Sequence, residues 1–267
     1  MLFWPRRIAE DLFRDWTVRR RLPAEFGSSP ILMSSAGGLG AIFKPVDKYD
    51  PTLLQLAKDL VKPGSTVWDI GANIGLFSVA AAARAGASGS IFSFEPDVVL
   101  VKLLRRTAGL QSESSARLTI VPVAVAADFG LRSFNIARRA RASNYLAEYG
   151  NSQTGGIAEA QTVMAVSVDK LATWLPKPDL LKIDVEGAEL EVLQGAKLML
   201  AEARPIVVCE VSGRNAGSVS QLLTCADYVL FDGGKPLSRE AIRLDAAWCT
   251  VAVPSEGVDR ISGSSVP

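Results

Sequence analysis

Short apolar runs alternate with stretches of helical periodicity along most of the chain. Runs such as LLKIDV (180–185) and PIVVCEV (205–211) are largely apolar or β-branched up to a charge near their end. Strands of this kind are typical of a parallel sheet that helices cover on both faces. The alternation therefore predicts an α/β fold whose ligands bind at the carboxyl ends of the strands.

The elements that this pattern predicts follow one another from residue 50 to residue 253. The expected strands span residues 66–70, 90–95, 117–125, 163–168, 179–184, 205–211, 228–232 and 247–253. The expected helices span residues 50–61, 75–85, 97–109, 188–202 and 216–226. Asp50 is expected to cap the first of these helices, with Pro51 at its first position.

The N-terminal residues stand outside this alternation. One helical face collects Ile8, Leu12, Phe13 and Trp16, and the arginines around it are Arg6, Arg7, Arg14, Arg19, Arg20 and Arg21. This pattern predicts an N-terminal helix that docks on the body or on the partner subunit of a homo-oligomer, or lies on an anionic membrane surface. Residues 30–44 read as two short strands around a glycine turn, which predicts a hairpin.

Three segments are expected in the chain as a whole. They are an N-terminal extension with a helix and a hairpin (1–46), one domain large enough to carry an enzyme active site (47–253) and a disordered tail (254–267). No run approaches the ~20 apolar residues of a membrane span, and the first residues lack the apolar core of a secretory signal. We therefore expect no transmembrane segment and a cytoplasmic location.

Residues 138–161 form a polar insertion rich in Gly, Ser and Asn. Long loops in compact domains are often lids or binding loops. Arginine forks suit phosphate or carboxylate groups, so the insertion predicts either an anionic acceptor or a solvated basic loop. The arginines concerned are Arg132, Arg138, Arg139 and Arg141.

Composition restricts the possible catalytic groups more than it restricts the possible binding partners. The 267 residues carry a formal net charge of +1, so no overall field favours nucleic acid as a partner. The chain has no histidine, and its three cysteines show no paired CxxC spacing, which argues against a zinc site. Any general base must therefore be a carboxylate, Lys, Tyr or Cys.

A glycine turn follows the first expected strand of the domain, in the stretch VWDIGANIG. Gly71 and Gly75 let the backbone take positive φ and let a ligand approach closely. Asp69 would repel a pyrophosphate but attract an ammonium or sulfonium group, and Glu95 at the end of the next strand can accept ribose hydroxyls. The pattern favours S-adenosylmethionine over NAD, because the turn lacks GxGxxG.

A second acidic block occupies the expected strand ends of residues 179–184 and 205–211. Asp184, Glu186 and Glu210 should converge there if the two strands are neighbours, with Lys182 on the same strand face as Asp184. Three roles stay open: a carboxylate base of raised pKa, Mg²⁺ or Mn²⁺ held by Asp184 and Glu210, or Lys182 as a neutral base. A purely structural ion pair is the further alternative, and Glu189 and Glu191 are expected to be solvated.

Five segments of the chain resemble the FkbM family of S-adenosylmethionine-dependent methyltransferases. They read VWDIGANIGLFS, FSFEPD, VPVAVAADFG, LLKIDVEGAELEVLQGA and PIVVCEV, in the family's order. The resemblance implies a Rossmann-like three-layer sandwich, with a mostly parallel seven-stranded sheet whose last strand is antiparallel. It implies further that the methionine moiety lies on Asp69, Gly71, Asn73 and Gly75, the ribose on Glu95, and the adenine near Ala124.

The resemblance implies methylation of a hydroxyl on a saccharide, glycolipid or secondary metabolite. An N-acceptor is an alternative, because nothing in the sequence fixes the nucleophile. A non-catalytic module that binds S-adenosylmethionine and regulates a partner is a second alternative. An NAD(P)-linked oxidoreductase is a third, although no Tyr-x-x-x-Lys pair is present.

Overall fold

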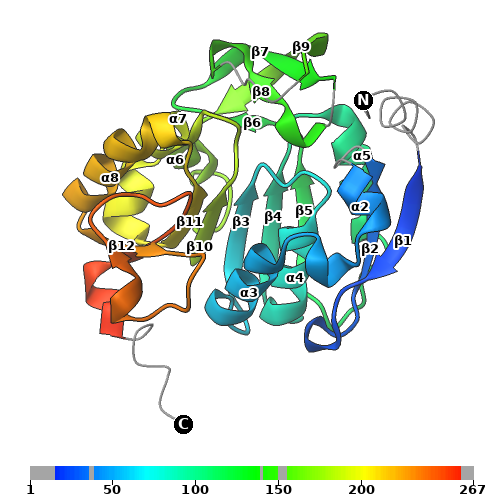
Figure 1. Ribbon diagram of the computed structural model, residues 1–267, viewed down its shortest axis with the longest axis horizontal. Coiled ribbons are helices and arrows are strands. Elements are labelled where there is room, and N and C mark those ends of the chain that lie inside the picture. The colour runs from blue at the N-terminus through cyan, green and yellow to red at the C-terminus, as the bar shows by residue number, and fades with distance from the viewer. Residues whose placement is uncertain (1–15, 36–38, 139–140, 150–154, 260–267) are drawn as a thin grey trace, which may run out of the picture.

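The computed structural model describes residues 16–35, 39–138, 141–149 and 155–259, which form a three-layer α/β sandwich (Figure 1). Within these residues the central sheet has eight strands in the order β13-β12-β14-β11-β10-β3-β4-β5. The strands are β3 (Thr66–Ile70), β4 (Ser90–Phe94), β5 (Arg117–Val121), β10 (Leu180–Ile183), β11 (Ile206–Glu210), β12 (Tyr228–Asp232), β13 (Ile242–Arg243) and β14 (Cys249–Pro254).

Strand directions confirm the expected sheet. The five strands from β11 to β5 run parallel, and β14 inserts antiparallel between β11 and β12. The seven longer strands thus form the Rossmann-like sheet with an antiparallel last strand. The two-residue β13 at the β12 edge is an addition that the sequence did not predict.

The two faces of the sheet carry separate hydrophobic cores, as the two-residue period of a strand requires. Val67 belongs to one core, together with side chains of α3 (Pro51–Leu60), α4 (Leu76–Ala85) and α5 (Val98–Ala108). Trp68 belongs to the other, together with side chains of α6 (Val168–Leu171), α7 (Glu189–Gln194) and α8 (Ala216–Cys225). Asp50 caps α3 as expected, since its Oδ1 accepts from Leu53 N at 3.0 Å.

A second sheet covers the carboxyl ends of the central strands (Figure 1). Its order is β6 (Ala124–Val125), β9 (Ile157–Val166), β7 (Gly130–Ala137) and β8 (Tyr145–Leu146). The expected continuous strand 117–125 is wrong, because Pro122 has no N–H to donate and the chain turns there into β6. The insertion 138–161 is also more regular than expected, since it contributes β8 and the first half of β9.

The N-terminal prediction is partly wrong. Thr17–Arg21 forms β1, which pairs antiparallel with β2 (Pro30–Ser34), so Arg19 to Arg21 lie on a strand and not on a helix. The second strand expected within residues 30–44 is the short helix α2 (Leu39–Phe43). The expected helix before Trp16 lies outside the described residues. Leu32 N donates to Thr107 Oγ1 at 3.2 Å, which ties β2 to α5.

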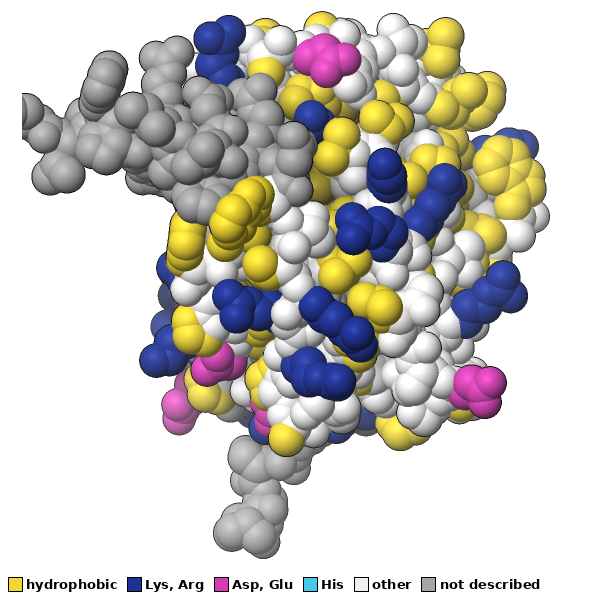
Figure 2. Space-filling model, turned by 90° about the vertical axis from the view of Figure 1, so that its right-hand side faces the viewer, with side chains coloured by type: hydrophobic (Ala, Val, Ile, Leu, Met, Phe, Trp, Pro, Cys, Tyr) yellow, Lys and Arg dark blue, Asp and Glu magenta, His cyan; other side chains and the backbone are white. Residues whose placement is uncertain are grey.

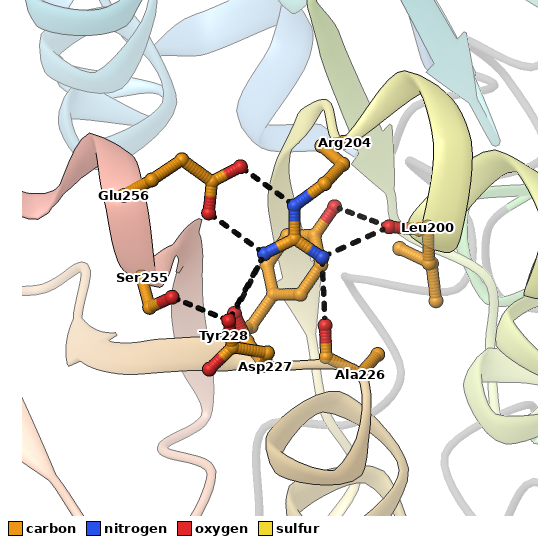
Figure 3. A network of polar contacts seen from close by, with 7 residues as sticks. All are labelled: Leu200, Arg204, Ala226, Asp227, Tyr228, Ser255 and Glu256. Carbon is orange, nitrogen blue, oxygen red and sulfur yellow. Dashed lines mark hydrogen bonds and ion pairs between the residues drawn. The ribbon is translucent and has the colours of Figure 1, made fainter.

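The C-terminal part differs from the prediction in two places. The expected helix 188–202 ends with α7 at Gln194, and residues 199–203 form a π-helical turn. The first residues of the expected tail are docked, because Glu256 in the 3₁₀ turn Ser255–Gly257 forms a paired contact with Arg204 (Figure 3). Arg204 also donates to Ala226 O at 2.8 Å and lies over the Tyr228 ring. Residues 260–267 lie outside the described part.

Candidate active site

A pocket lies between the carboxyl edge of the central sheet and the second sheet. It encloses about 630 Å³, part of which is open to solvent, a size usual for small-molecule sites. The central sheet contributes Gly71, Asn73, Glu95 and Asp184 to its lining, with Glu186 just beyond β10. Ala124 and Tyr145 line it from the second sheet. The pocket thus collects many of the residues that the sequence selected.

The two glycines of the turn take the positive φ that was expected, but protein atoms and not a ligand occupy the space beside them. Gly71 has φ +75°, and a Cβ there would lie 1.9 Å from the carbonyl oxygen of Asp184. Gly75 has φ +89°, and its Cβ would lie 2.6 Å from Leu104 Cδ2. Both positions therefore need glycine because protein atoms pack against them, and only Gly71 of the two lines the pocket.

Asn73 presents an unsatisfied polar atom at this turn. The residue has φ +52°, in the left-handed region, and its backbone N donates to Glu95 Oε2 at 2.9 Å. Its side-chain Oδ1 is buried and has no hydrogen-bond partner among the described residues. Buried polar atoms are normally paired, so this oxygen is available to a donor on a bound ligand.

Glu95 is the buried acid of the pocket, with 5% of its surface exposed. Its Oε1 accepts from Asp97 N at 2.9 Å, and its Oε2 from Asn73 N at 2.9 Å. Burial raises the pKa of Glu95 to about 7, although these two hydrogen bonds act in the opposite direction. Each carboxylate oxygen retains a further lone pair, so Glu95 can also accept from two ligand hydroxyls.

Behind the pocket wall, Lys182 joins the two strand ends. Its Nζ lies 3.0 Å from Asp69 Oδ1 and 3.2 Å from Asp184 Oδ2, and it donates to Gly71 O at 2.9 Å. Ser78 Oγ donates to the second oxygen of Asp69 at 2.6 Å. Asp69 is fully buried and faces Lys182, so its charge is balanced by this lysine and not reserved for a cationic ligand.

The neutral-base role considered for Lys182 is wrong. Burial lowers the pKa of Lys182, but the charges of Asp184 and Asp69 outweigh burial and raise the pKa above its ordinary value. The side chain therefore stays protonated. Its contact with Gly71 O and with the carboxylates on two strands makes it a fixed cation that positions the turn.

Glu210 ends β11, which lies beside β10 in the sheet. Burial raises the pKa of Glu210 to about 8, the Asp184 charge acts in the same direction, and Lys182 opposes it. Asp50 and Glu186 raise it further, which shows that the expected carboxylates share one electrostatic environment. A carboxyl group with such a pKa can exchange a proton near neutral pH.

The carboxylates do not form a donor set for Mg²⁺ or Mn²⁺. Across the described ranges, no three His, Cys, Asp or Glu side chains gather in an arrangement that could hold a metal ion. The position between Asp69 and Asp184 is taken by the Lys182 ammonium group. The metal role considered for Asp184 and Glu210 is therefore not supported.

Glu189, expected at the surface, is buried with 3% exposure. It accepts from Gly187 N at 3.0 Å, from Ser212 Oγ at 3.1 Å and from Asn215 Nδ2 at 2.6 Å. These hydrogen bonds hold the turn that follows β10 against the segment that follows β11. Gly187, whose backbone N is one of the three donors, has φ +92°, a conformation that favours glycine at this turn.

The insertion is clamped to the start of α5. Asp97 is fully buried, and its Oδ2 accepts from Arg141 Nη1 at 2.6 Å and from Asn144 Nδ2 at 2.8 Å. Arg132 pairs with Asp128, and Arg138 donates to Ile157 O at 3.4 Å. Arg141 thus ties the insertion to α5, and the contacts of Arg132 and Arg138 lie within the second-sheet segment itself. Arg139 lies outside the described residues.

Residues 69–230 match the Methyltransferase FkbM domain, a stretch that contains the glycine turn, Glu95 and both acidic strand ends. The chain belongs to the FkbM methyltransferase family. It is an S-adenosylmethionine-dependent methyltransferase, with the Rossmann-like sheet described above. The NAD(P)-linked oxidoreductase and the non-catalytic module considered from the sequence are thereby set aside.

A relative of this FkbM methyltransferase is the hexuronic acid methyltransferase AglP of Haloferax volcanii, 26% identical over 174 residues. The alignment covers 64% of this chain and 66% of the relative. The crystal structure of methyltransferase FkbM from Methylobacillus flagellatus KT is 16% identical with a TM-score of 0.43, covering 66% of this chain and 46% of that chain. The crystal structure of precorrin-6y C5,15-methyltransferase from Geobacter metallireducens is 12% identical with a TM-score of 0.45, and the match covers 79% of this chain and 88% of that chain.

Proposed function

We propose that this FkbM methyltransferase methylates a hydroxyl oxygen of an acidic saccharide, with Glu210 as the proton acceptor. The observation that carries the proposal is the position of Glu210, which ends β11 beside Asp184 at the carboxyl edge of the sheet. Burial, followed by the Asp184 charge, raises the pKa of Glu210 to about 8 against the opposing effect of Lys182. An aliphatic hydroxyl needs a base during transfer, and its proton would pass to this carboxylate. The named activity of the hexuronic acid relative supports a saccharide acceptor.

The pocket fits S-adenosylmethionine by its polar atoms. Asn73 offers an unpaired buried oxygen, and Glu95, which accepts from Asn73 N, offers carboxylate oxygens beside it. We assign Glu95 to the ribose hydroxyls, Gly71 and Asn73 to the methionine moiety, and Ala124 to the adenine side. Asp69 and Gly75 do not line the pocket, and we assign them to holding the conformation of the turn. The bound cofactor supplies a methyl group on a sulfonium sulfur, and the protein orients the acceptor oxygen toward it.

Replacing Glu95 with glutamine should weaken S-adenosylhomocysteine binding about 10- to 100-fold, the scale of a lost charged hydrogen bond. The wild-type affinity should also fall as pH drops below about 7, because protonation of Glu95 removes an acceptor from the carboxylate. The Glu95→Gln variant should lose this pH dependence. Calorimetry over a pH series measures both effects, with Glu113→Gln on an exposed loop as the control. An unchanged affinity in Glu95→Gln contradicts the ribose assignment.

An anionic acceptor must enter a mouth that already holds several carboxylates. Arg214 places a guanidinium group against the backbone of Gly187, next to Glu186, and donates to Tyr149 O at 3.1 Å. Arg214 is exposed, whereas Lys182 is buried. Since arginine forks bind carboxylates well, we assign Arg214 to the acceptor's acidic group.

Arg214→Ala should raise KM for a hexuronate acceptor about 10- to 100-fold, as expected for a lost charge-assisted contact. The KM for the matched neutral hexose should change little, and Arg214→Lys should recover part of the loss. Initial rates with both acceptors measure the difference. An equal rise in KM for the neutral and the acidic sugar would assign Arg214 to the fold instead of the acceptor.

The proposal as a whole is tested by offering hexuronate-containing glycans, matched neutral glycans and amines with S-adenosylmethionine. Mass spectrometry identifies the product, and alkaline treatment distinguishes a stable methyl ether from a labile methyl ester. A methyl ether on the acidic glycan is the expected result. Methylation of amines alone would favour the N-acceptor, and a labile ester would move the reaction to the carboxylate.

A further inference from the structure

One exposed side of helix α5 carries cations and small apolar residues without a carboxylate. The helix reads VVLVKLLRRTA, and its exposed residues Val98, Val99, Lys102, Arg105 and Arg106 recur at helical spacing on one side. Its other side is buried in the core of the central sheet. Packing against the core therefore explains the residues on the buried side of α5 only. The exposed side of the helix contains no acidic residue.

The arginines of β1 extend the same surface. Arg19, Arg20 and Arg21 are exposed, and β1 pairs with β2, which contacts α5. Exposed Arg117 begins β5, which also packs against α5. We call this surface the basic face. Its members are Arg19, Arg21, Lys102, Arg105, Arg106 and Arg117. Arg20 points to the other face of β1 and donates to Ile42 O at 2.9 Å.

Figure 2 views this side of the molecule, with Lys and Arg side chains gathered across its centre and acidic side chains at its margin. None of these six cations has an acidic partner in the part of the chain that the structure describes. The whole chain has a net charge of only +1, so positive charge is concentrated here and negative charge lies elsewhere. A separation of this kind attracts an anionic surface.

Exposed apolar side chains accompany these cations. Val98 is 62% exposed and Val99 44%, at the start of α5, and Trp16 is 54% exposed at the start of β1. Tryptophan can stack on a nucleic-acid base, but valine cannot. Apolar side chains insert at the headgroup level of a bilayer while neighbouring Lys and Arg contact lipid phosphates. The exposed valines beside Lys and Arg therefore favour a lipid bilayer over nucleic acid as the partner.

We propose that the basic face docks this methyltransferase on an anionic phospholipid bilayer. None of the helices among the described residues is long and apolar enough to span a bilayer. Helix α5 begins at Val98, shortly after Glu95 and Pro96 in the pocket wall, so the docked face borders the cofactor pocket. Attachment therefore holds the pocket close to the membrane surface.

The test is co-sedimentation of the full-length protein with vesicles of phosphatidylcholine alone or with added phosphatidylglycerol. The wild type should pellet with the anionic vesicles only, and less at high salt. Lys102→Gln/Arg105→Gln/Arg106→Gln should lower the partition coefficient about 100-fold, since each cation near an anionic bilayer contributes about fivefold. A matched triple variant, Lys197→Gln/Lys235→Gln/Arg243→Gln, removes exposed cations from the other side of the sheet and should bind as wild type.

The apolar contribution is tested by Val98→Ser/Val99→Ser, which should weaken vesicle binding several-fold and leave S-adenosylhomocysteine affinity unchanged. That affinity also reports folding of both triple variants. The proposal is overturned if the wild type stays in solution with anionic vesicles, or if the two triple variants lose binding equally. Salt-sensitive binding to single-stranded or duplex RNA without vesicle binding would likewise overturn it and assign the face to nucleic acid.

Discussion

Replacing Glu210 with glutamine should lower kcat by about 10²- to 10⁴-fold, the usual contribution of a general base. The amide keeps the size of the side chain but cannot accept the hydroxyl proton. The wild-type rate should rise with pH through about 8, because the proton acceptor is the ionised form of Glu210 and its pKa is about 8. Glu210→Gln should lose this rise. Initial rates over a pH series measure both effects.

Two controls keep this result interpretable. S-adenosylhomocysteine affinity should be unchanged in Glu210→Gln, because Glu210 is assigned to the acceptor hydroxyl and lies beyond the residues that line the cofactor pocket. Asp184→Asn is the matched variant on the neighbouring strand, and it should shift the Glu210 pKa downward by removing a nearby negative charge. Its pH–rate profile should move to lower pH. A Glu210→Gln variant with nearly full activity would contradict the assignment and transfer the role to Asp184.

Replacing Lys182 with methionine should lower the free energy of unfolding by about 3–5 kcal/mol, the scale for breaking a buried ion pair. The reason is that Asp69, which is fully buried, would lose its cation. The double variant Lys182→Met/Asp69→Asn should regain much of this loss, because it removes the stranded charge as well. Urea unfolding followed by circular dichroism measures all three proteins.

An exposed ion pair serves as the comparison for the buried Lys182–Asp69 pair. Lys58 and Glu25 lie 2.7 Å apart, with 43% and 45% of their side chains exposed. Lys58→Met should cost less than about 1 kcal/mol, because solvent already screens this pair. If Lys182→Met were as mild as Lys58→Met, the strand-end cluster would not depend on a buried charge.

The convergence of the acidic residues could be predicted because parallel strands bring their carboxyl ends to one edge. Glu95 and Glu210 each close an apolar run, and each lies where that rule places it. The observed strand order β11-β10-β3-β4 makes the strands neighbours, which was the condition set for the convergence. Local sequence and a general rule were sufficient here.

Pairings between distant residues could not be predicted in the same way. Lys182 faces Asp69 because β10 and β3 align these residues in register, and register between distant strands is not visible in either segment alone. The reason for Gly71 is the Asp184 carbonyl group on another strand, a contact that no local pattern records. Glu189 resembles its helical neighbours in sequence, and its burial depends on Ser212 and Asn215.

The second sheet departs from the central one after β5 and returns to it before β10, so residues 124–166 are one continuous excursion of the chain. The first junction, Val123 to Val125, lines the pocket, and Val166 at the other end of the excursion pairs with Val125. The parallel ladder β3-β4-β5 receives no strand from the excursion. The segment that covers the pocket can therefore be exchanged while the strands that carry Gly71 and Glu95 keep their register. A chimera that carries the excursion of a relative is the engineering counterpart of that exchange.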